Sequence, residues 1–142
     1  MEDHLAPQRS LRSRFDDFKR ALERRDRAAY ELALRDFQAG FKRWSEAEEP
    51  VLLAALLRAP IPGRDPQREL RLEYVQVREL ARYLLDQVRG NAPMGDLLGL
   101  VENLDRRLGA HETEMERVYY PAALGAFTDA ERRALADSAR SV

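Results

Sequence analysis

Apolar residues recur every three or four positions along almost the whole of this chain, and that periodicity limits what it can fold into. The residues form four stripes, at 11–22, 30–48, 70–88 and 97–118. A three-four spacing places side chains along one face of an α-helix, and the resulting seam is typical of helices that pack in four-helix bundles. No segment shows the two-residue alternation of a β-strand. The sequence therefore predicts an all-α fold.

Residues suited to helix ends lie between the stripes. Asp26 is a good N-cap for the second helix, Asp65 followed by Pro66 is typical of the start of the third, and Thr128 with Glu131 predicts a capping box. These signals place helices at about 4–25, 27–58 with a break near Pro50, 66–89 and 93–119, and a short helix at 129–140. Because short connections make neighbouring helices antiparallel, we expect a single domain over 1–142: an up-down-up-down four-helix bundle with a short C-terminal fifth helix.

Composition excludes several kinds of function. The chain has 142 residues, with 24 basic and 25 acidic side chains and a formal net charge of −1. That balance argues against a nucleic-acid partner, which calls for a basic face. The sequence has no cysteine, so disulfides and thiolate metal sites are excluded. Since it also shows no signal peptide and no membrane-spanning run, we expect a cytoplasmic protein, a monomer or homodimer, without a membrane partner.

Four residues interrupt the apolar stripes, one on each long helix: His4, Glu48, Tyr74 and His111. Measured from the end of the bundle that holds the turns near 26 and 91, the first two lie roughly 32 Å along their helices and the last two roughly 24–27 Å. All four therefore belong to the same half of the bundle and are expected to point inward. The only two histidines of the chain are predicted to converge.

Inward-facing imidazole and carboxylate groups at one level of a helical bundle are typical of a metal site. A buried carboxylate without a partner is costly, and a cation offsets that cost. Nitrogen and oxygen ligands without sulfur suit iron or manganese, and zinc is a further option.

The same residues belong to a pattern that resembles the hemerythrin-like (HHE cation-binding) domains. The pattern combines an early histidine, a core glutamate on the second helix, a ligand position on the third that Tyr74 occupies here, and H-x4-E followed by RVYYP. It covers nearly the whole chain and is most specific in EEPVLLAAL (48–56) and AHETEMERVYYPAAL (110–124). The resemblance implies a four-helix bundle with a non-haem, dinuclear iron centre that binds or senses oxygen.

Carried over to this chain, the resemblance implies a metal set of His4, Glu48, Tyr74, His111 and Glu116. Tyr74 replaces the usual third-helix histidine and can ligate as a phenolate.

Two positions depart from the family pattern. Trp44 replaces the second-helix histidine and cannot bind a metal, and Arg78 stands where some members carry a second histidine on the third helix. Because few nitrogen ligands remain, a mononuclear or weakly occupied site is an alternative to the dinuclear centre.

The two histidines also have ordinary structural interpretations. His4 lies in an N-terminal stretch of the kind that often frays. His111 can simply pair with Glu112 or Glu114 near the end of the bundle.

Tyr74 and Glu116 have such interpretations too. Tyr74 can be a core residue whose hydroxyl binds Glu48 or His111. Glu116 follows His111 by five residues, a turn of about 140° beyond a full one, so it faces away from His111 unless the helix is locally widened. Met115 holds the regular inward position.

The leading hypothesis is a metal-binding protein that binds or senses oxygen or peroxide, or handles iron, with metal ions and dioxygen or peroxide as its partners. The alternative, favoured by Trp44, is a degenerate metal-free bundle that serves as a regulatory or protein-interaction domain. Oxidase or peroxidase chemistry has less support, because no nucleophile–base pair, nucleotide motif or substrate signal appears in the chain.

Overall fold

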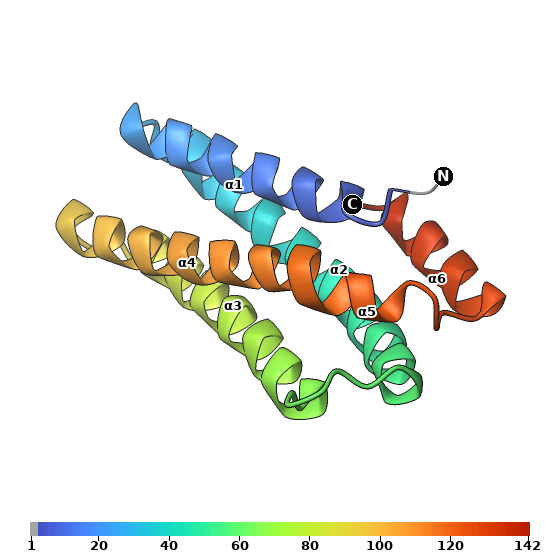
Figure 1. Cartoon of the computed structure of the whole chain (residues 1–142). Coiled ribbons are helices and arrows are strands. Elements are labelled where there is room, and N and C mark those ends of the chain that lie inside the picture. The colour runs from blue at the N-terminus through green and yellow to red at the C-terminus, as the bar shows by residue number, and fades with distance from the viewer. Residues whose placement is uncertain (1–2) are drawn as a thin grey trace.

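A computed structural model describes residues 3–142 of the chain, and every regular element in that range is a helix (Figure 1). In chain order the elements are α1 (Ala6–Glu23), α2 (Arg27–Arg58), α3 (Pro66–Arg89), α4 (Met94–Glu114), the π-helical turn η1 (Met115–Tyr119), α5 (Tyr120–Ala123) and α6 (Asp129–Ala139). The predicted all-α class is confirmed. None of the helices in the described range is both long and apolar enough to cross a membrane.

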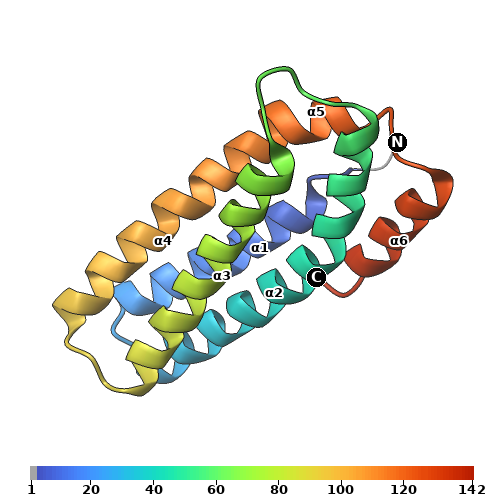
Figure 2. The same ribbon diagram turned by 90° about the horizontal axis from the view of Figure 1, so that it is seen from below.

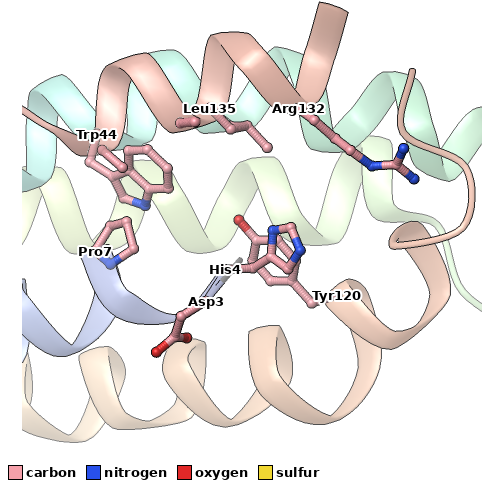
Figure 3. Close-up of a pocket in the computed structure, with 9 residues that line it drawn as sticks. Asp3, His4, Pro7, Trp44, Tyr120, Arg132 and Leu135 are labelled. Carbon is pink, nitrogen blue, oxygen red and sulfur yellow. The ribbon is translucent and has the colours of Figure 1, made fainter. Parts of the chain in front are cut away.

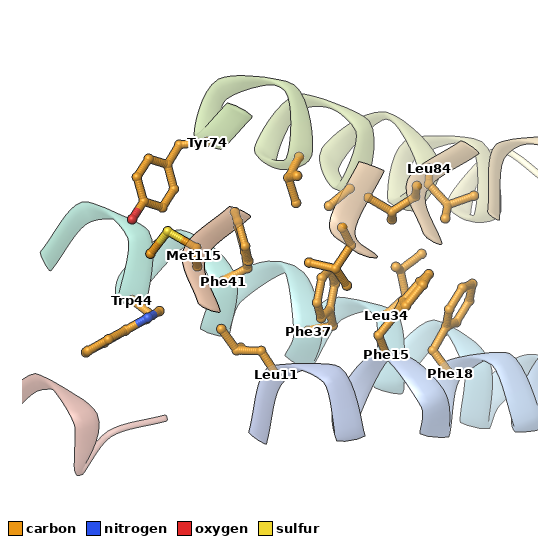
Figure 4. Packing of buried hydrophobic residues seen from close by; sticks show 14 of the residues in the cluster. Leu11, Phe15, Phe18, Leu34, Phe37, Phe41, Trp44, Tyr74, Leu84 and Met115 are labelled. Carbon is orange, nitrogen blue, oxygen red and sulfur yellow. The ribbon is translucent and has the colours of Figure 1, made fainter. Parts of the chain in front are cut away.

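The four long helices lie alongside one another and enclose one apolar core (Figures 1 and 2). α1 packs on α2, α2 on α3, and α3 on α4. Aromatic rings fill the half of the core farthest from the chain termini, where Phe15 lies 5.8 Å from Phe18 and 5.2 Å from Phe37 between ring centroids (Figure 4). The residues of the four predicted stripes are buried, apart from the partly buried Val118, so the periodicity located most of the core. The core also includes buried residues beyond the stripes, at 52–56 of α2 and from Tyr119 to Leu135.

Most helix ends lie where the sequence predicts them. The Asp26 carboxylate caps α2 by accepting a hydrogen bond of 3.2 Å from a backbone N–H of the first turn. Thr128 and Glu131 form the expected capping box at the start of α6. Pro66 begins α3 after Asp65, although the side chain of Asp65 makes no capping hydrogen bond.

The expected break near Pro50 is wrong, because α2 continues through this residue to Arg58. Proline lacks an N–H, so the carbonyl of Glu46 loses its helical partner. Both residues are exposed, and water can therefore bind that carbonyl in place of the missing donor. The rest of the helix is held by the side chains that it buries against α1 and α3.

The fourth predicted helix, 93–119, is divided by a change of helix type. α4 ends at Glu114 and passes directly into η1 and then α5. A π-helical turn bonds residue i to i+5 and so accommodates one extra residue. The side chains after the turn are consequently rotated relative to a regular helix, and the consecutive residues Tyr119 and Tyr120 are both buried.

The terminal helix α6 lies across the end of the bundle, beside the start of α1, and packs on α2 (Figure 1). Arg58 ties it in place, since its guanidinium donates to the carbonyl of Ala126 at 2.9 Å and to the carboxylate of Glu131. Leu135 is its buried residue. This end of the molecule also contains the residues discussed below.

Replacing Phe37 by alanine should lower the free energy of unfolding by about 3–5 kcal/mol, because its ring is fully buried against Phe15. Urea unfolding followed by circular dichroism measures the change. Leu32→Ala, on the same helix but 49% exposed, should change it by less than about 0.5 kcal/mol. Equal losses in the two variants would contradict the assignment of the core.

Candidate functional site

A buried carboxylate and two tyrosine hydroxyls form the centre of the candidate site, here called the Glu48 cluster: Glu48, Tyr74 and Tyr120. Glu48 comes from α2 and is only 3% exposed. Its Oε1 accepts a hydrogen bond from the Tyr74 hydroxyl of α3, and its Oε2 accepts one from the Tyr120 hydroxyl of α5. Three helices are thus joined through one carboxylate, and both of its oxygens have a donor.

Burial governs the protonation of the cluster. Loss of hydration raises the pKa of Glu48, and the hydrogen bonds from Tyr120 and Tyr74 offset only part of that increase. Burial and the neighbouring Glu48 carboxylate also raise the pKa of Tyr74 well above its usual value and raise that of Tyr120. Both phenols therefore keep their protons at neutral pH and act as donors.

His111 lies beside the cluster on α4 and is 5% exposed. Its ring stands edge-on to Tyr74, with 4.9 Å between the ring centroids. Nδ1 lies 3.0 Å from Oε1 of Glu73. An ionised carboxylate can only accept, so Nδ1 carries the proton, and in the neutral ring Nε2 then keeps its lone pair.

A chain of polar groups runs outward from His111. The second oxygen of Glu73 accepts a hydrogen bond of 3.3 Å from the Tyr119 hydroxyl, which lies 3.4 Å from a guanidinium nitrogen of Arg64. Arg64 in turn binds Glu114 at 2.8 Å. The carboxylate that orients His111 is itself held on its other side, which is the arrangement found behind metal-ligating histidines.

A cavity of about 10 Å³ lies at the edge of the cluster, and its lining includes Glu48, Tyr74 and His111. Phe41 and Trp44 close its apolar sides. Such a volume is enough for one water molecule or one small ion and no more. Three of the five predicted ligands are therefore among the residues that line this small space.

His4 is placed next to the cluster but outside this cavity. It precedes α1, which begins at Ala6 and not at the predicted residue 4. Its ring stacks on Tyr120, with centroids 5.9 Å apart (Figure 3). The centroid of the Phe127 ring lies 6.4 Å away. His4 and His111 thus reach the same cluster through different tyrosines.

Glu116, the fifth predicted ligand, is exposed. The helix is locally widened, but the π turn begins at Met115, and the residues that it buries are Tyr119 and Tyr120. Met115 is buried at 1% exposure, beside Tyr74 and Trp44 (Figure 4). Within residues 3–142 no three histidine, aspartate or glutamate side chains are grouped closely enough to hold a metal by themselves.

Sequence reasoning missed two residues of the site. Tyr120 lies beyond the predicted apolar stripes, because its inward position depends on the extra residue of the π turn. Glu73 is partly exposed and lies on no apolar stripe, so no pattern indicated it. The predicted pairing of His111 with Glu112 or Glu114 is wrong, since these two carboxylates bind Arg12 and Arg64.

Comparison with known proteins adds no identification. Protein-family models, curated proteins and solved structures were each searched, and none matches the chain. The resemblance to hemerythrin-like domains therefore stays a prediction, supported by the motifs of the chain itself.

Replacing Glu48 by glutamine should change how stability depends on pH. Because the folded-state pKa of Glu48 is raised, the native state binds the proton more tightly, and stability falls as pH rises through that pKa. Each pKa unit corresponds to about 1.4 kcal/mol. In the presence of a chelator, Glu48→Gln should remove this fall and be the more stable form at pH 8, as measured by thermal melts from pH 5 to 8.

Glu46→Gln provides the matched control, because Glu46 is exposed on the same helix. It should retain the pH profile of the unaltered protein. A Glu48→Gln profile that also stays unchanged would mean that Glu48 ionises in the folded state at its ordinary pKa.

Proposed function

We propose that this protein is a non-haem iron protein of the hemerythrin-like kind, an up-down-up-down bundle in the cytoplasm that handles iron or binds oxygen or peroxide. The observation that carries the proposal is the single-atom cavity bordered by Glu48, Tyr74 and His111. It brings a carboxylate, a phenol and an imidazole to one space, and hard or borderline metal ions such as iron prefer these oxygen and nitrogen donors.

The residues fit one ion better than two. Glu48, Tyr74 and His111 border the cavity, and Tyr120 supplies a further oxygen at the Glu48 carboxylate. Glu116 is exposed, and a cavity of about 10 Å³ has no room for a second ion. We therefore propose a mononuclear centre in place of the dinuclear one that the family resemblance implies.

Bound iron would supply the reversible redox chemistry that oxygen or peroxide binding requires. The surrounding residues prepare the site for it. Glu73 holds the proton on Nδ1 of His111 and leaves Nε2 as the donor atom. Phe41 and Trp44 give the cavity apolar walls. A phenol must lose its proton to ligate, so metal uptake should release protons and strengthen as pH rises.

Elemental analysis tests the proposed ligand set. Protein produced in iron-supplemented medium should retain close to one iron per chain. Glu48→Gln and His111→Ala should lower the metal affinity by at least about tenfold, whereas Glu116→Gln should leave it unchanged because that side chain is exposed. Less than about a tenth of an equivalent in the unaltered protein would contradict the proposal, and loss of metal in Glu116→Gln would return Glu116 to the ligand set.

Tyr74 offers a spectroscopic test of the same centre. A phenolate bound to Fe(III) produces a charge-transfer band in the visible, so the oxidised iron-loaded protein should be purple to amber. Tyr74→Phe should remove the band, with a stability change of about 1–2 kcal/mol from the lost hydrogen bond. Tyr83→Phe is the control, since Tyr83 is 49% exposed on the same helix. An unchanged spectrum in Tyr74→Phe would exclude Tyr74 as a ligand.

A second candidate function is a metal-free regulatory or protein-interaction domain. The hydrogen bonds of Glu48 favour it, because both carboxylate oxygens already have tyrosine donors and need no cation. Trp44 also occupies the position of a family histidine. Thermal melts with and without Fe(II), under anaerobic conditions, separate the two functions: a ligand bound only by the native state raises the melting temperature, and no shift at saturating Fe(II) would favour the metal-free domain.

A further inference from the structure

A second pocket, larger than the small cavity beside the Glu48 cluster, also borders Trp44. Its volume is about 210 Å³, and it is formed where α6 crosses the start of α1 and the end of the bundle (Figure 3). Trp44 lines both spaces, and Tyr120, which donates to Glu48, forms part of the wall of the larger one. Nothing in the proposed iron function uses this pocket.

The walls of the pocket suit a flat apolar group. Trp44 and Pro7 lie at one end, the stacked rings of His4 and Tyr120 form one side, and Leu135 of α6 lies opposite (Figure 3). Aromatic rings bind other rings in offset or edge-on contact. A cavity of about 150 Å³ accepts a benzene ring, so the volume here leaves space for a ring with one small substituent.

The charged groups at the pocket favour an anionic substituent. Asp3 is paired with Arg9, and because both side chains are more than half exposed, the charge of this carboxylate is largely screened by water. Arg132 lies at the end opposite Trp44 (Figure 3). Its guanidinium binds the carbonyl of Leu124 at 3.2 Å and Asp129 at 3.4 Å. These bonds use part of its five N–H donors, and the pairing with Asp129 is weak because that carboxylate is 87% exposed.

We propose that this pocket binds a small planar aromatic carboxylate, with the ring between Trp44 and the His4–Tyr120 pair and the carboxylate at Arg132. Arginine is well matched to that role, since its planar fork of N–H groups fits the two oxygens of a carboxylate. Leu135 would cover the ring from α6. The ligand would then contact Tyr120, a member of the Glu48 cluster, and Trp44, which also lines the small cavity beside that cluster.

Trp44 is the only tryptophan of the chain, so its fluorescence reports directly on the pocket. We would titrate protein treated with a chelator with benzoate, and in parallel with benzyl alcohol, a neutral molecule of similar size. Benzoate should change the emission saturably, with a Kd on the order of a millimolar or lower, and should bind at least about tenfold more tightly than benzyl alcohol. Isothermal titration calorimetry would confirm that the change reflects binding and not collisional quenching.

Variants of α6 locate the binding. Arg132→Ala should weaken benzoate binding by at least about tenfold, while Arg133→Ala, an exposed neighbour outside the pocket, should change it by less than about twofold. Ala136→Phe, which fills the pocket, should abolish it, with circular dichroism to verify folding. Absence of saturable binding, equal binding of benzyl alcohol, or equal effects of the two arginine variants would overturn the proposal. Because the protein is metal-free in these assays, such a result would leave the iron proposal standing.

Discussion

The end of the bundle that contains the candidate site depends on the buried carboxylate of Glu48. An uncompensated charge in an apolar core would cost several kcal/mol or would be neutralised by a proton. The hydroxyls of Tyr74 and Tyr120 offset part of that cost by donating to its two oxygens. These bonds fasten α2 to α3 and α5. A carboxylate in a largely apolar core therefore specifies how the helices meet at this end.

The π-helical turn is what makes this arrangement possible. Tyr120 reaches Glu48 only because one extra residue is accommodated between α4 and α5. The same shift buries Tyr119, whose hydroxyl binds Glu73, and Glu73 orients His111. One local departure from α-helical geometry thus supplies a donor to the Glu48 cluster and a support to the neighbouring histidine. π turns are often found at functional sites, and this one directly precedes Tyr120 of the Glu48 cluster.

The sequence predicted the helices, their caps and the core well, because each depends on local pattern: apolar spacing, Asp26 before α2, and the Thr128 capping box. It also predicted the buried positions of Glu48, Tyr74 and His111, which follow from the same spacing. It could not predict the partners of these residues. Those partners depend on tertiary geometry. The π turn that begins at Met115 rotates the side chains after it, and Arg12 and Arg64 bind Glu112 and Glu114, so that neither carboxylate pairs with His111. Neither periodicity nor composition indicates these contacts.

Charge bears on how many ions the Glu48 cluster could hold. If Tyr74 and Tyr120 gave up their protons, the two phenolates and the Glu48 carboxylate would together carry three negative charges, which one trivalent ion balances. Glu73 could not add to that sum without releasing His111, to which it is bonded at 3.0 Å. Glu116 is exposed and its charge is largely screened by water. A second cation would therefore be buried without compensation, at a cost that a medium of low polarity makes severe. Electrostatics and cavity size agree in limiting the proposed centre to one metal ion.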